Sequence, residues 1–303
     1  MSGIVFNYTF MLTAVLLLGG ISGYLCERAG IVNIGIDGMM CFGAIFFGIF
    51  SSPKVMNIGP AGIIFALLLA TICTSITGLL HGFATIKLKA NHIISGTAID
   101  LVGVALATFI NEPLGLSLFG TTKLQSGIND FLYMGGSIYG SALIMFALAI
   151  IIAAVIFVII NFTKVGLRYK AVGENPAAVD SLGINPIKYQ WIAVILGSMA
   201  AGMAGAIFLF NVKQFPGSCQ GYGYLSLAIL IVGAWKIEWI SVASFIFAVF
   251  TSLSMSSVLT NLGFPREVAL ALPYMITVVV LLFFSKWVRA PEHDGIPYSR
   301  QAR

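Results

Sequence analysis

Nine long apolar runs dominate the sequence, and short polar or glycine-rich segments separate them. At 1.5 Å of helical rise per residue, most of these runs are long enough to cross the hydrocarbon core of a bilayer, which is about 30 Å thick. They are apolar on every side and lack the alternation typical of barrel strands. The sequence therefore predicts an all-α, polytopic membrane protein with about nine transmembrane helices, folded as a single transmembrane domain over residues 1–303. The runs cover residues 5–25, 35–52, 60–86, 92–111, 137–162, 189–211, 222–235, 239–260 and 268–285.

A shortage of charge excludes most other classes of protein. Only 9% of the residues are Asp, Glu, Lys or Arg, whereas a soluble domain carries about 25%, so a soluble enzyme and a disordered chain are both excluded. The four cysteines are scattered, without a C-x-x-C pair or a histidine cluster, which argues against a zinc site or a disulfide framework. Nucleotide-binding, zinc-peptidase and serine-nucleophile motifs are absent. We therefore expect no catalytic residue, no metal site and no cofactor bound by this chain.

The positions of Lys and Arg indicate an orientation. If all nine runs cross and the polar segment 163–188 is cytoplasmic, twelve basic residues lie inside and four lie outside. The positive-inside rule then places the N-terminus outside and the C-terminus in the cytoplasm. The inside set is Arg28, Lys87, Lys89, Lys164, Arg168, Lys170, Lys188, Lys236, Lys286, Arg289, Arg300 and Arg303, and the outside set is Lys54, Lys123, Lys213 and Arg266.

Two apolar runs begin with a glycine-rich interruption. Residues 33–38 combine two glycines with Asn33 and Asp37, and residues 216–224 contain three glycines with Gln220 and Tyr222. Broken helices of this kind are typical of transporter sites, and the two runs are predicted to cross in opposite directions, as an inverted repeat requires. We expect Asn33, Asp37, Gln220 and Tyr222 to approach a translocation pathway.

Each interruption also has a simpler interpretation. Asn33 and Asp37 can serve as the cap and first-turn charge of an ordinary helix. The second segment can be an ordinary glycine-rich outer loop. The charge count places Cys219 outside, where we expect a membrane-impermeant thiol reagent to label it. His81 and Asp100 lie inside apolar runs; we expect His81 to be a helix-packing residue and Asp100 to hydrogen-bond a neighbouring helix. The small residues at 197–205 predict close helix packing.

The longest predicted cytoplasmic segment, 163–188, specifies a short helix. Asn175 is a good N-cap, Pro176 suits the first helical position, and Gly183 is a natural stop. A rigid two-turn helix flanked by basic residues suits docking to a cytoplasmic partner, although a capped loop helix without a partner fits the same spacing. The candidate docking residues are Glu174, Asn175, Pro176, Ala177, Ala178, Val179 and Leu182.

Four segments together resemble the permease subunits of bacterial ABC importers, in the nucleoside branch of the group that includes ribose and branched-chain amino acid permeases. They are residues 27–38, 91–96, 173–184 and 289–298. The resemblance implies a chain that forms half of a translocation pathway for nucleosides in the inner membrane, with 163–188 as the loop that couples it to an ATPase. It also implies a second related permease, a cytoplasmic ATPase that holds ATP and Mg²⁺, and an external substrate-binding lipoprotein, and no nucleic acid partner.

Three residues depart from the family pattern and leave the cargo open. The family often has Glu where this chain has Asp37, an acidic residue where it has His92, and Arg where it has Tyr222. Simple sugars such as ribose or galactose are therefore an alternative cargo. A secondary transporter driven by an ion gradient is the alternative from another class, and the lack of a buried acid–base relay argues against it.

Overall fold

The computed structural model describes residues 2–51, 61–111, 139–212, 215–256, 263–284 and 289–299. Within these ranges all regular structure is helical. The ends of several predicted runs and the basic residues Lys54, Lys123, Lys213, Lys286, Arg300 and Arg303 lie outside the described residues. The helices are α1 (Ser2–Glu27), α2 (Ile36–Ser51), α3 (Ala61–Gly82), a π-helical turn η1 (Phe83–Lys87), α4 (His92–Asn111), α6 (Tyr139–Phe162), α7 (Lys164–Glu174), α8 (Pro176–Ser181), α9 (Pro186–Val212), α10 (Tyr222–Val232), α11 (Ile237–Met255) and α13 (Arg266–Phe284).

Every predicted apolar run coincides with a helix, but not every helix is a full span. Six of the described helical stretches are long and apolar enough to cross a membrane, while Ile36–Ser51, Tyr222–Val232 and Ala271–Val280 are shorter. The all-α, multi-pass prediction is therefore confirmed, and the count of about nine crossings is not. Helix α10 has 11 residues and rises only about 17 Å, which is too short to cross a bilayer. It is therefore a half-helix, as the short apolar run 222–235 indicated.

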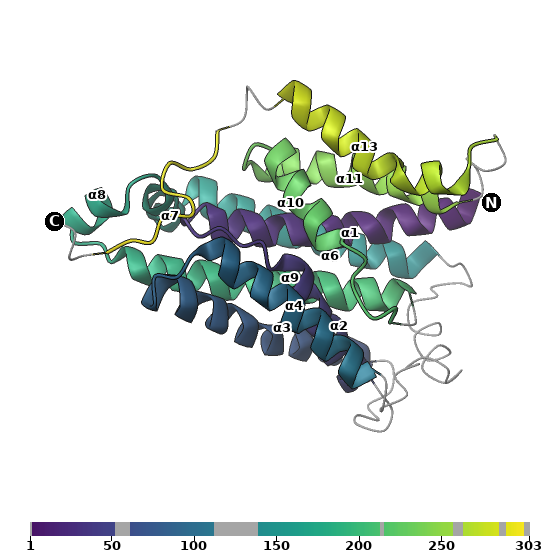
Figure 1. Cartoon of the computed structure of the whole chain (residues 1–303), viewed down its shortest axis with the longest axis horizontal. Helices are drawn as coiled ribbons and strands as arrows, with labels where there is room; N and C mark the ends of the chain where they lie inside the picture. Colours follow the sequence, from purple (N-terminus) through teal and green to yellow (C-terminus); the bar gives the residue numbers. More distant parts are fainter. Residues whose placement is uncertain are drawn as a thin grey trace.

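Helix α1 forms the axis of the bundle (Figure 1). Helices α6, α9, α10 and α11 all pack against it, and 94% of its most apolar window is buried, compared with 22% for α4 and α6. Its side chains are apolar all round, as expected for a helix that neighbours enclose on every side. The centre of this bundle is therefore a packed helix.

Glycines allow the second layer of helices to cross closely. A Cβ on Gly43 of α2 would lie 2.1 Å from the carbonyl oxygen of Gly202 on α9, and one on Gly205 would lie 1.8 Å from that of Met40. Backbone atoms cannot move aside as a flexible side chain can, so only glycine fits at these crossings. The prediction of close packing at 197–205 is confirmed.

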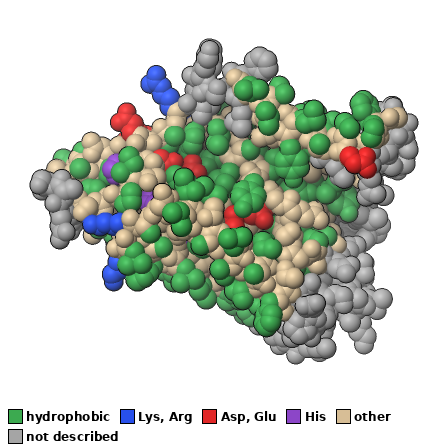
Figure 2. Space-filling model, in the orientation of Figure 1, with side chains coloured by type: hydrophobic (Ala, Val, Ile, Leu, Met, Phe, Trp, Pro, Cys, Tyr) green, Lys and Arg blue, Asp and Glu red, His purple; other side chains and the backbone are tan. Residues whose placement is uncertain are grey.

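The two ends of the bundle differ in character. We call the end that carries α8 the α8 end, and the opposite end, where α1 begins, the N-terminal end (Figure 1). On the face in Figure 2 the described Lys and Arg side chains lie toward the α8 end, and hydrophobic side chains cover the flanks. Segments at the α8 end carry Arg28, Lys87, Lys89, Lys164, Arg168, Lys170, Lys188, Lys236 and Arg289.

The crossing of α2 and α9 predicts a position-specific defect. Gly43→Val should lower the melting temperature and folded yield of the purified protein, because overpacking a tight contact commonly costs about 1–3 kcal/mol. The matched control is Ala154→Val on the exposed side of α6, which should leave both unchanged. Equal melting temperatures for the two variants in detergent would contradict the crossing.

Candidate functional site

The two glycine-interrupted segments meet inside the bundle. Residues 31–34 are non-helical and lead into α2, and Gly221, with φ +78°, leads into α10. An Oδ1 atom of Asp37 accepts a hydrogen bond of 2.9 Å from the backbone N–H of Gly223, and a Cβ on Gly223 would lie 2.3 Å from the nitrogen of Asp37. The first turns of α2 and α10 are therefore in direct contact.

Asp100 of α4 braces the same place. Its Oδ1 accepts a 2.6 Å hydrogen bond from the N–H of Gly38, and the phenol of Tyr224 on α10 lies beside the same carboxylate. Both carboxylates are buried, with 4% of each residue exposed. The first turn of any helix has N–H groups without an intrahelical acceptor, and here two carboxylates supply acceptors. The predicted bond from Asp100 to a neighbouring helix is confirmed.

The α2 and α10 segments run in opposite directions. Helix α2 starts from the loop that follows Glu27 at the α8 end and brings Phe47 against Phe210, near the far end of α9. Helix α10 starts beside Met255 at the end of α11 and leads back to Trp235, whose indole N–H donates to Glu27. Helices α2 and α10 therefore point away from each other, and their N-terminal turns face each other.

Asn33 shapes the entry to α2. Its Oδ1 accepts a hydrogen bond of 3.1 Å from the N–H of Gly35, and its amide nitrogen lies 3.6 Å from Sγ of Cys26 and 3.5 Å from Sδ of Met39. The side chain is fully buried. Asn33 thus makes a turn next to the first turn of α2, which holds Asp37.

His81 is a packing residue, as expected. Its ring hydrogen-bonds Ser95 and the carbonyl of Val32.

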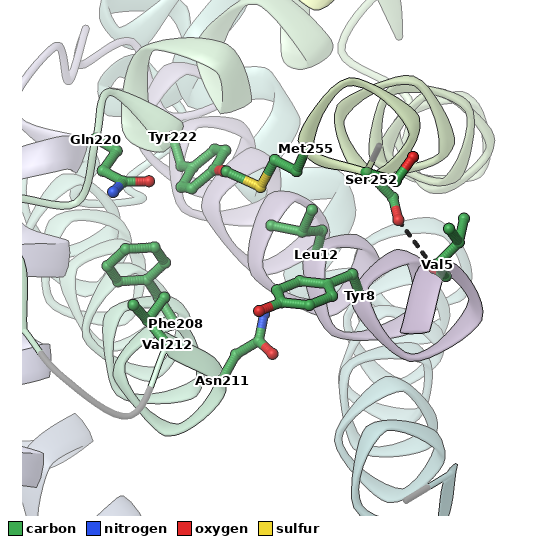
Figure 3. Close-up of a pocket in the computed structure, with 11 residues that line it drawn as sticks. Val5, Tyr8, Leu12, Phe208, Asn211, Val212, Gln220, Tyr222, Ser252 and Met255 are labelled. Atoms are coloured by element: carbon green, nitrogen blue, oxygen red, sulfur yellow. Dashed lines mark hydrogen bonds between the residues drawn. The ribbon is translucent and has the colours of Figure 1, made fainter. Parts of the chain in front are cut away.

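A cavity of about 200 Å³ lies at the N-terminal end, where four helices converge (Figure 3). It is enclosed by the first turns of α1, the last turns of α9 and α11, and the start of α10. Gln220 and Tyr222 line it, whereas Asn33 and Asp37 do not. Figure 3 shows Tyr222 and Met255 on one side of the cavity and Tyr8 and Asn211 on the other. The lining residues are Val5, Tyr8, Leu12, Phe208, Asn211, Val212, Gln220, Tyr222, Ser252, Met255 and Ser256.

A second cavity of about 180 Å³ adjoins the first. Gln220, Tyr222 and Met255 line both, and the hydroxyl of Tyr222 lies 3.7 Å from Sδ of Met255. This pair of side chains forms the wall between the two spaces. Pro273 and Tyr274 of α13 contribute to the second cavity, so the two cavities extend from α1 across to α13.

The cavity is aromatic and polar but carries no formal charge. Three aromatic rings, two amides and two serine hydroxyl groups line the first cavity, and neither an acidic nor a basic side chain is among its lining residues. Aromatic faces suit planar ligands, and a few placed amides fix their orientation. The arrangement can bind a neutral molecule with a flat ring and several hydrogen-bonding groups.

Helix α8 at the opposite end has the predicted caps. The Oδ1 of Asn175 accepts a 3.0 Å hydrogen bond from the N–H of Ala178, and the N–H of Ile184 donates to the carbonyl of Val179 past Gly183, which has φ +77°. Ala177, Ala178 and Leu182 are exposed, as are Glu174 and Asn175, but Pro176 and Val179 are buried against their own chain.

The model of the family described as branched-chain amino acid transport system, permease component, matches residues 5–281. The chain belongs to this family. It is therefore the membrane-embedded permease of an ABC transporter, and ATP hydrolysis is carried by a separate ATPase subunit.

Named relatives match this permease over nearly its whole length. The nucleoside ABC transporter permease protein NupC of Lactococcus lactis subsp. cremoris is 32% identical, covering 93% of this chain and 92% of that protein. The guanosine ABC transporter permease protein NupQ of Bacillus subtilis is 30% identical, covering 97% and 96%. The glucose ABC transporter permease protein TsgB13 of Haloferax volcanii is 25% identical, covering 88% and 72%.

A solved structure shares the fold. An ABC transporter in an inward-facing conformation superimposes with a TM-score of 0.51 at 16% identity, covering 92% of this chain and 86% of that one. At this identity the likeness supports the helical arrangement alone.

Several residues that line the permease cavity could not be predicted from the sequence. Tyr8, Phe208 and Asn211 lie inside or at the edge of apolar runs, where nothing distinguishes a cavity-facing side chain from a packed one. Asn211, the polar residue at the end of the run 189–211, was the one available signal.

One expectation about this region is wrong. Cys219 was expected in an outer loop open to thiol reagents, but it is fully buried, because the segment 215–221 folds back into the bundle and places Cys219 against Cys41 of α2.

The contact between α2 and α10 predicts a difference between two variants. Asp37→Ala should lower the melting temperature of the permease, because it leaves the buried N–H of Gly223 without its acceptor, at a cost of about 1–3 kcal/mol. Asp37→Asn keeps an oxygen acceptor and should melt close to the unchanged protein while altering transport. If Ala and Asn melt alike, the hydrogen bond does not hold the two helices together.

Proposed function

We propose that this permease forms one half of the translocation pathway of an ATP-driven nucleoside importer. The observation that carries the proposal is the uncharged cavity at the N-terminal end, with Tyr8, Phe208 and Tyr222 as aromatic surfaces and the amides of Asn211 and Gln220 beside them. A nucleobase is flat and rich in donors and acceptors, and a ribose adds hydroxyl groups. NupC and NupQ, named for nucleoside and guanosine transport, support the same cargo.

A sugar cargo is the second candidate, because TsgB13 is named as a glucose transporter permease. Sugars also use amides and an aromatic surface, so the cavity could hold one. Three aromatic rings around one small space favour a base over a sugar, because a base is itself aromatic and can stack on both faces.

The orientation follows from the placement of charge. Nine of the ten basic residues in the described ranges, all but Arg266, lie in segments at the α8 end, which the positive-inside rule assigns to the cytoplasm. The N-terminal end, with the cavity, then faces outward, where a substrate-binding lipoprotein would deliver its cargo. On this proposal Gln220 and Tyr222 line the pathway, whereas Asn33 and Asp37 support it by holding the starts of α2 and α10.

A second permease completes the pathway. The axis of this bundle is filled by α1, so a continuous passage requires a surface from another subunit. We propose a related permease as that subunit, and a cytoplasmic ATPase that binds ATP and Mg²⁺ and docks on α8. The exposed Ala177, Ala178 and Leu182 form the docking face, whereas Pro176 and Val179 fasten the helix to its own chain.

The cavity predicts an amide-dependent uptake. Asn211→Ala should lower ATP-dependent uptake of labelled guanosine by the reconstituted complex at least roughly tenfold, because a bound base would lose a hydrogen-bonding partner and leave its own polar group unpaired. The matched control is Asn161→Ala, an exposed amide at the end of α6, which should keep full uptake. A complex that takes up ribose or glucose but no nucleoside would establish the sugar alternative. Uptake without ATP would contradict the proposal of an ATP-driven importer.

The docking face predicts a loss of assembly. Ala178→Glu places bulk and an unpaired charge in a protein interface, which commonly costs several kcal/mol. We expect normal membrane insertion but loss of the ATPase on co-purification, together with loss of uptake. Ala290→Glu adds the same charge at the same end, at an exposed residue outside α8, and should retain the ATPase. If the Ala178 variant keeps the ATPase at the yield of the unchanged protein, α8 is not the docking element.

A further inference from the structure

The C-terminal tail, residues 289–299, crosses the α8 end and contacts two loops that are far apart in the sequence (Figure 1). The N–H of His293 donates a 3.0 Å hydrogen bond to the carbonyl of Gly173, at the end of α7. The N–H of Gly295 donates a 3.2 Å bond to the carbonyl of Gly30, in the loop between α1 and α2. The tail is thus bonded, through its backbone, to the segment before α8 and to the loop that leads into α2.

Three glycines let these backbones approach. A Cβ on Gly173 would lie 2.3 Å from the carbonyl oxygen of Arg28, and one on Gly30 would lie 3.2 Å from that of His293. Gly30 and Gly295 also have φ of +84° and +78°, which L side chains rarely adopt. We call Gly30, Gly173 and Gly295 the glycine junction. At this three-way backbone contact a side chain on Gly173 would collide with the loop after α1, and one on Gly30 or Gly295 would strain the backbone.

Beyond the junction the tail reaches α8 and the turn before α4. The hydroxyl of Tyr298 donates a 3.1 Å hydrogen bond to Oδ2 of Asp180 on α8, and Nζ of Lys89 donates a 2.8 Å bond to Oγ of Ser299. Helix α8 has only six residues, and Asn175 alone separates it from α7. The bond to Tyr298 adds a contact from the side that helps to fix its position.

The loop after α1 continues the connection into the bundle. Arg28 forms an ion pair of 3.3 Å with Glu174 and donates two hydrogen bonds to the carbonyl of Trp235, in the turn between α10 and α11. The indole of Trp235 donates a 2.6 Å bond to Glu27. The segment next to α8, the loop before α2 and the turn after α10 therefore meet at one place.

Asp294 of the tail lies near Glu27, and burial favours the neutral form of its carboxyl group. Burial raises the pKa of Asp294 to about 7, and the carboxylate of Glu27 is near enough to interact with it electrostatically. A carboxyl close to neutrality costs less to bury than an ionised one. The tail can thus pack against the bundle in spite of its acidic residue.

Building on the proposed function, we propose that the C-terminal tail is a positioning element for coupling, which ties α8 to the loop before α2 through the glycine junction and the Tyr298–Asp180 bond. A displacement of α8 by the ATPase would then move the loop before α2 and the turn after α10 together with it. Without the tail, α8 would keep its docking face but would transmit less of the displacement.

The test compares two glycines with the same backbone strain. Gly295→Val strains a φ of +78° and places its Cβ 3.2 Å from Val32, whereas Gly263→Val strains a φ of +88° where nothing lies within 4 Å. In hydrogen exchange on the assembled complex, Gly295→Val should speed exchange of residues 28–35 and 173–182 by roughly tenfold, as expected for loss of local protection. Gly263→Val should leave the exchange rates of both segments at those of the unaltered protein.

The functional readout is nucleoside taken up per ATP hydrolysed. Gly295→Val, and a chain that ends at residue 288, should keep the ATPase and its hydrolysis but lower this ratio at least roughly fivefold, and Tyr298→Phe should give a smaller loss in the same direction. Unchanged exchange, an unchanged ratio, or loss of the ATPase itself would each overturn the proposal. If the unaltered complex carries no nucleoside, the proposed function fails, while hydrogen exchange still decides whether the tail holds α8.

Discussion

A helix that begins inside a membrane protein exposes backbone N–H groups that no water can satisfy. Both α2 and α10 begin in this way, and the carboxylates of Asp37 and Asp100 accept from Gly223 and Gly38. The acceptors come from different helices, so each bond that completes one helix also fixes the place of another. The close glycine contacts around them follow from the same requirement, because a carboxylate on one helix reaches the amide of the next only if the backbones nearly touch.

This arrangement joins the two ends of the molecule by short, stiff elements. Helix α10 carries Tyr222 in the cavity wall at its first residue, and the turn that follows its last residue holds Trp235 against Arg28 and Glu27. Eleven helical residues therefore separate the cavity from the contacts beside α8. A rigid helix with packed partners at both ends is the kind of element that can pass a displacement from one site to another. The tail adds the lateral connection from α8 to the same contacts.

Features encoded by local spacing were predictable from the sequence, and features that depend on distant partners were not. Run lengths predicted the helices, and Asn175, Pro176 and Gly183 predicted both ends of α8, because capping acts within a few residues. The half-helix α10 was indicated by its short run. The burial of Cys219 and the contacts of Asn33 with sulfur atoms depend on how segments fold back. Nothing local indicates that Gly295 would meet Gly30 across 265 positions of sequence, and Asn211 looks in the sequence like the end of an apolar run.

The same carboxylates that hold the half-helices together bear on the charge of the cargo. Two helix N-termini that meet inside a transporter would ordinarily attract an anion, because their N–H groups and dipoles favour negative charge. Here Gly38 and Gly223 already donate to carboxylates of the chain itself, so a phosphate would find these donors occupied and two acidic side chains beside them. The cavity adds no basic residue that could bind a phosphate instead. A pathway built in this way favours a nucleoside over its phosphorylated form, and the discrimination comes from the groups that complete the helix ends.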